Sequence, residues 1–148
     1  MGLEEWLEEK YELTEEHFEV FKNEFMYWVD ELGMKGWEFI FKLIELTDAR
    51  AQCMPGQRGR VVVVCLNTVW EGQEVTEYEL RRTGYHEALE LFLSKMTQLA
   101  QERSVTDADI EEETHNLIRT LENVMWEKSF AERYPKLQPP KKSPKRKK

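Results

Sequence analysis

Apolar residues recur along this chain with two different periods, and the change of period predicts an α+β fold. Between Thr14 and Gly33 they return every three or four positions, which is the spacing of an amphipathic helix with Thr14 as its N-cap. From residue 37 to residue 44 the period is two, because aromatic residues or leucine occupy every second position. The pattern therefore predicts an N-terminal helix followed by a strand.

Two further strands are expected in the middle of the chain. Residues 49–54 form the less regular of the two, and residues 60–66 are rich in valine. The sequence Pro-Gly-Gln-Arg-Gly between them, residues 55–59, favours a turn. Together these segments predict a small, mainly antiparallel sheet, followed by a loop over residues 70–74.

The second half of the chain is predicted to be helical. Thr76 with Glu79 three residues later suggests a capping box, and the helix that it starts should extend to about residue 103. Thr106 or Asp107 then caps a last helix, which should end near residue 130. We expect one domain over residues 1–134 and a disordered basic tail over 135–148.

Composition agrees with a single domain and limits the function classes. The chain has 148 residues, of which 41% are hydrophobic and 34% charged, and its net charge is −8. No apolar run approaches the roughly 20 residues that a membrane helix needs. The acidic N-terminus does not resemble a secretion signal, so a cytoplasmic location is expected.

The C-terminal tail reverses the sign of the charge. Six of the last eight residues are Lys or Arg. Such a segment could make weak, nonspecific contacts with the phosphates of a nucleic acid, or it could be a solubilising or cloning-derived tail.

The segment His86-Glu87-Ala88-Leu89-Glu90 carries the clearest candidate chemistry. On a helix, His86 and Glu90 point the same way and could hold one divalent ion, while Glu87 projects beside them. HExxH is a zinc motif for this reason, and its Glu serves as general base. Here Glu90 stands in place of the second His. The alternative is an ordinary solvated helix face.

A third ligand is expected from the last helix. Glu113 falls on the face marked by the apolar residues of that helix, where a carboxylate needs a partner. A metal ion shared with His86 and Glu90 would be such a partner. His115 is the competing donor, and Glu113 could instead be solvated or paired with an arginine.

With this motif, residues 33–126 resemble the short zincin-like metallopeptidases found among phage proteins. The likeness consists of strands, a Trp-containing loop, a helix in which His-Glu leads into Leu and Phe residues, and a Glu-rich helix ending in Leu-Glu. The resemblance implies that His86 is a zinc ligand and Glu87 the catalytic base. It also implies a peptide or protein substrate and, for a phage-encoded protein, the cytoplasm of the host cell.

Glu90 changes what such a site would do. Two carboxylates bring more negative charge to the ion than one, so the bound water would be less acidic and hydrolysis slower. Oxygen ligands also shift the preference from zinc toward Mn²⁺, Mg²⁺ or Fe²⁺. The sequence thus predicts a zincin-like metallopeptidase or metal-binding relative, with loss of the metal as an equally simple outcome. The alternative is a non-enzymatic binding protein on the same scaffold, acting on a host protein or nucleic acid.

Overall fold

A computed structural model describes residues 9–126, 128, 131–132 and 135–136. Nearly all of the predicted basic tail and the predicted helix end near residue 130 lie outside these residues. The elements are β1 (Lys10–Glu12), α1 (Glu15–Glu31), β2 (Glu38–Ile44), β3 (Ala51–Gly56), β4 (Val61–Asn67), β5 (Val69–Glu71), α2 (Glu77–Gln101), α3 (Asp107–Leu121) and the π-helical turn η1 (Glu122–Trp126).

The main sheet has three strands in the order β2-β4-β3. β4 pairs antiparallel with β3 and parallel with β2, while β1 and β5 form a separate antiparallel pair. The predicted α+β class is confirmed, but the parallel pairing was not expected. The valine-rich strand β4 is the central strand of the sheet, where its apolar side chains are buried best. The chain forms the edge strand β3 first and then turns back to form β4 between β2 and β3.

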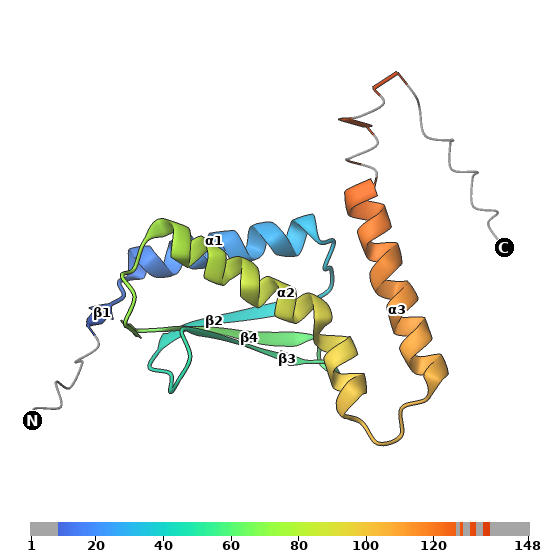
Figure 1. The fold of residues 1–148 in the computed structure, drawn as a ribbon, viewed down its shortest axis with the longest axis horizontal. Coiled ribbons are helices and arrows are strands. Elements are labelled where there is room, and N and C mark those ends of the chain that lie inside the picture. The colour runs from blue at the N-terminus through green and yellow to red at the C-terminus, as the bar shows by residue number, and fades with distance from the viewer. Residues whose placement is uncertain (1–8, 127, 129–130, 133–134, 137–148) are drawn as a thin grey trace, which may run out of the picture.

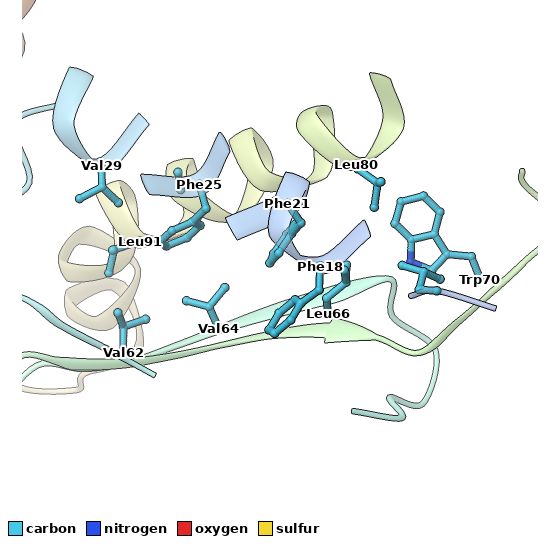
Figure 2. Close-up of a cluster of buried hydrophobic side chains, with 12 residues drawn as sticks. Phe18, Phe21, Phe25, Val29, Val62, Val64, Leu66, Trp70, Leu80 and Leu91 are labelled. Atoms are coloured by element: carbon cyan, nitrogen blue, oxygen red, sulfur yellow. The ribbon is translucent and has the colours of Figure 1, made fainter. Parts of the chain in front are cut away.

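Helices α1 and α2 lie side by side on one face of this sheet, as Figure 1 shows. Phe21 and Phe25 of α1 are fully buried, and they pack with valines of β4 and leucines of α2 (Figure 2). Residues 37–44 alternate as predicted, with Phe39 and Phe41 packed against this core. Burial of these large apolar side chains is the main force that holds α2 to the sheet.

Trp70 belongs to the core and not to a loop, so the loop predicted over residues 70–74 begins only after Glu71. It lies in β5 and is 1% exposed, and its ring nitrogen donates to the carbonyl oxygen of Arg50 at 3.3 Å. The partner strand β1 ends at Glu12, shortly before α1 begins at Glu15. It has no clear strand pattern in the sequence, and its antiparallel pairing with β5, with Tyr11 opposite Trp70, defines it.

Helix α3 begins at a capping box, in which the side chains of Thr106 and Asp109 each accept a hydrogen bond from the backbone N–H of the other residue. It stands apart from the two-layer body, beyond the end of α2 (Figure 1). None of its residues is buried, although the apolar stripe predicted for it is present in the sequence. Within the described residues, no helix combines the length and apolar character needed to cross a membrane.

Candidate functional site on helix α2

The candidate motif lies in the first half of α2, where the helix packs most closely on its neighbours. The Thr76 side chain accepts a hydrogen bond from the backbone N–H of Glu79 and caps the start of the helix. Gly84 lies against α1, and a Cβ atom there would be 2.8 Å from the carbonyl oxygen of Phe21. The absence of a side chain at Gly84 therefore allows the close approach that sets the rotation of α2, and with it the directions of His86 and Glu87.

His86 and Glu90 face outward and contact each other. Their side chains are 68% and 53% exposed, and His86 Nε2 lies 3.2 Å from Glu90 Oε1. This is the i, i+4 contact that the motif predicts. Both residues also line a cavity of about 470 Å³ between α2 and the start of β3.

Glu87 lines the same cavity but, unlike His86 and Glu90, it is buried. The residue is 4% exposed, and its Oε2 is fully buried with no hydrogen-bond partner among the described residues. Burial, followed by the negative charge of Glu90 and a hydrogen bond with it, raises the pKa of Glu87 to about 8. At neutral pH this carboxyl is therefore mostly protonated.

Glu113 does not join this group. It lines a different cleft, between α3 and the body, whereas His86, Glu87 and Glu90 line the cavity beside β3. His115 is exposed, and its Nδ1 lies 3.0 Å from the carbonyl oxygen of Glu111. Among the described residues, no three His, Cys, Asp or Glu side chains are grouped as metal ligands would be.

This donor set does not fit the catalytic metal site that the resemblance implies. Catalytic zinc sites use three protein ligands and keep a fourth position for water. His86 and Glu90 supply two, and the described residues bring no third donor to them. We therefore derive no catalytic step through a metal ion.

A larger cavity continues along β3 from the motif. It has a volume of about 830 Å³ and lies between the second half of α2 and the β3–β4 turn. Glu90 lines both this cavity and the one beside His86, so the two meet at its side chain. Together they form a groove, which we call the β3–α2 groove.

The strand that borders this groove has unpaired backbone groups. β3 is an edge strand, and no other strand of the described residues pairs with its free side. The carbonyl oxygen of Arg50 accepts the N–H of Asn67 in β4. Backbone groups alternate along an antiparallel strand, so those of Ala51 and Cys53 face away from β4. Pro55, next in this alternation, is a residue that edge strands tolerate.

The groove residues on α2 were missed by the sequence analysis, although a signal was present. Glu90, Ser94, Gln98 and Gln101 recur at spacings of three or four, which places a polar stripe on one helix face. Ser94 accepts a hydrogen bond from Gln57 of the β3–β4 turn at 2.8 Å. A polar stripe next to an apolar one indicates a helix side that faces a groove.

Cys53 lines the groove but is not a reactive thiol. Burial, with a smaller contribution from the nearby carboxyls of Glu87 and Glu90, raises its pKa to about 12. Because the thiolate is the nucleophile, Cys53 is inert at neutral pH.

Comparisons of the chain with models of protein families, with curated proteins and with solved structures gave no match. The likeness to zincin-like metallopeptidases therefore rests on the sequence motif, and the function has to be argued from the groove and its residues.

Proposed function

We propose that this protein is a non-enzymatic binding protein that holds an extended peptide segment of a partner protein in the β3–α2 groove. The observation that carries the proposal is the position of this groove beside a free strand edge. An extended peptide can add to such an edge as a further strand, with main-chain hydrogen bonds for affinity and pockets for alternate side chains.

The groove also contains a buried acceptor in need of a donor. Gln98 lines the larger cavity, and its Oε1 is buried without a hydrogen-bond partner among the described residues. A buried acceptor without a donor costs free energy. If the Gln98 side chain turns toward the groove, an N–H group of a bound peptide satisfies this oxygen, and binding then removes a penalty that the free protein carries.

Peptide binding without cleavage agrees with the state of Glu87. A general base has to be ionised and within reach of a water molecule at the working pH. Glu87 is buried and its pKa is about 8, so at pH 7 it holds the proton that it would have to accept. Among the described residues, His86 and Glu90, which contact each other, also supply only two of the three protein ligands that a catalytic metal site needs.

A display library of random dodecapeptides, selected on the full-length chain, tests this proposal. An enriched peptide, made synthetically, should bind saturably. Thr97→Trp places a large ring in the groove and should weaken binding about tenfold or more. The matched control is Ala100→Trp, at an exposed position of the same helix outside the groove, which should leave the affinity unchanged. No enrichment, or equal loss with both tryptophans, would contradict the proposal.

The metallopeptidase that the sequence predicts is tested in the same preparation. Zn²⁺ or Mn²⁺ is added with an unfolded protein substrate, and the products are measured by mass spectrometry. We expect no cleavage and no rise of Tm with metal, because an ion that binds the folded state must stabilise it. Metal-dependent cleavage that disappears in Glu87→Gln would replace our proposal with the enzymatic one.

A further inference from the structure

A second cleft, between α3 and the body, has an unusual charge for this protein. Its volume is about 520 Å³, and we call it the α3 cleft. Its charged lining residues are Lys35 after α1, Arg60 in the β3–β4 turn, Lys95 on α2 and the single carboxylate Glu113 on α3. The whole chain carries a net charge of −8, so this excess of cations is a local exception.

Arg60 is held in place on the wall of this cleft. Its Nε donates to the carbonyl oxygen of Gly36 at 3.0 Å and its Nη2 to that of Lys35 at 2.7 Å. The guanidinium lies 4.9 Å from the ring centroid of Trp37. A guanidinium has five N–H groups, so donors remain for a ligand after these two bonds.

The backbone conformation of Arg60 is also unusual. Its φ is +50°, a left-handed conformation that favours glycine and costs an L-residue about 1 kcal/mol or more. The side chain has a structural task at this strained position, because its two hydrogen bonds tie the β3–β4 turn to the loop before β2.

The two lysines have no such structural task. Lys35 and Lys95 are exposed, and within the described part of the chain neither of them, nor Arg60, forms an ion pair. Three cations from three segments that are distant in sequence thus line one cavity with one carboxylate, Glu113. Lys95 also lies near Asp109 at the start of α3, where hydrogen bonds with Thr106 lower the pKa of the Asp109 carboxyl and the charge of Lys95 adds to this effect.

We propose that the α3 cleft binds the phosphate group of an anionic ligand. A planar guanidinium fixed in position and two mobile ammonium groups are the donors that suit a phosphate, which offers several acceptor oxygens. The volume of the cleft lies within the roughly 300–1,000 Å³ typical of small-molecule sites, which is the size class expected of a nucleotide site. Glu113, the predicted metal ligand, here opposes the ligand's charge and limits its affinity.

Calorimetric titration of the full chain with inorganic phosphate and with ATP tests this site. Lys35→Gln and Lys95→Gln should each weaken ATP binding about tenfold, since each removes a charge-assisted hydrogen bond. Glu113→Gln should strengthen it. Lys42→Gln, the same charge change on an exposed residue of β2 outside the cleft, should have no effect. Absence of saturable binding to either probe, or equal loss in Lys42→Gln, would overturn the proposal.

A single-stranded oligonucleotide distinguishes the two sources of phosphate. If a nucleic acid is the ligand, it should bind more tightly than ATP, depend on Lys35 and Lys95, and still bind a chain that ends at residue 136. If a small molecule is the ligand, removal of the basic tail should abolish DNA binding and leave ATP binding intact. Gln57 and Ser94 line both the α3 cleft and the β3–α2 groove, but Thr97 lines the groove alone, so Thr97→Trp should not change ATP affinity.

Discussion

The first half of α2 and the whole of α3 are both capped, amphipathic helices, yet they relate to the rest of the molecule in opposite ways. The first half of α2 buries Leu80, Glu87 and Ala88, because the rest of the two-layer body covers that side of the helix. α3 buries none of its residues and shares with the body a cleft lined by cations. An apolar stripe in the sequence is enough to form a helix, but the partner surface decides whether that helix becomes part of a core.

The same contrast separates two carboxylates that the sequence assigns to one metal site, Glu87 as its catalytic base and Glu113 as a ligand. Glu87 lies in the apolar layer and keeps its proton, whereas Glu113 lies partly exposed among lysines and an arginine. Their environments suit different tasks. One is a neutral buried group beside a peptide groove, and the other is a counter-charge in an anion-binding cleft.

The largest difference between the two regions should appear when one apolar side chain is removed from each. Phe21→Ala, in the core, should lower the free energy of unfolding by about 3–5 kcal/mol, because a large cavity replaces a fully buried ring. Ile118→Ala, on α3, should change it by about 0.5 kcal/mol or less. Urea unfolding measures both. A loss of several kcal/mol for Ile118→Ala would show that α3 is packed in solution.

Glu87 should make stability depend on pH. Its folded pKa of about 8 lies above the ordinary 4.5, so the folded state holds its proton more tightly than the unfolded state. The contribution of Glu87 to the free energy of unfolding should be highest below pH 4.5, fall as the pH rises from 4.5 to 8, and level off above. The fall of this contribution should be at most about 5 kcal/mol.

Glu87→Gln, which is neutral at every pH, should remove this contribution. Chemical denaturation of both proteins at pH 5, 7 and 9 measures the difference between them. An equal pH dependence in the variant and the wild type would mean that Glu87 is ionised in the folded protein.

Gly84 tests how closely the helix packing depends on a missing side chain. Gly84→Ala should destabilise by about 1–3 kcal/mol, because its Cβ would press on the backbone of α1, even though Ala favours the helix by about 1 kcal/mol. Thr114→Ala, at an exposed site on α3, is the matched control and should be nearly neutral. Stabilisation by Gly84→Ala would show that α1 and α2 are further apart than the structure has them.

The smallest effect concerns reactivity and not stability. In a Cys65→Ala background, Cys53 should react with iodoacetamide at pH 8 at least about a hundredfold more slowly in the folded than in the unfolded chain, because burial raises its pKa to about 12. Timed alkylation followed by mass spectrometry gives the rate. Fast reaction would mean that the wall of the groove opens at this point.

Parts of the site could be predicted because they depend on near neighbours in the sequence. The contact between His86 and Glu90 follows from helix geometry alone, and it is present at 3.2 Å. That Glu113 and Leu117 share a side of α3 could be predicted in the same way, since both line the α3 cleft. The burial of Glu87 could not be predicted from the sequence, because it depends on how α1 and the sheet pack around this side chain.

The sequence by itself determined the three helices and the three strands of the main sheet, where three threonines cap the helices, and which residues of β2 face the core. These are local properties, set by side-chain period and by hydrogen bonds over three or four residues. Only the tertiary structure decided that β4 runs parallel to β2, that Trp70 is a core residue and that Glu113 joins Lys35 and Arg60 instead of His86. Those outcomes depend on contacts between segments far apart in the chain. No local sequence pattern specifies which surface of one segment will pack against which surface of another.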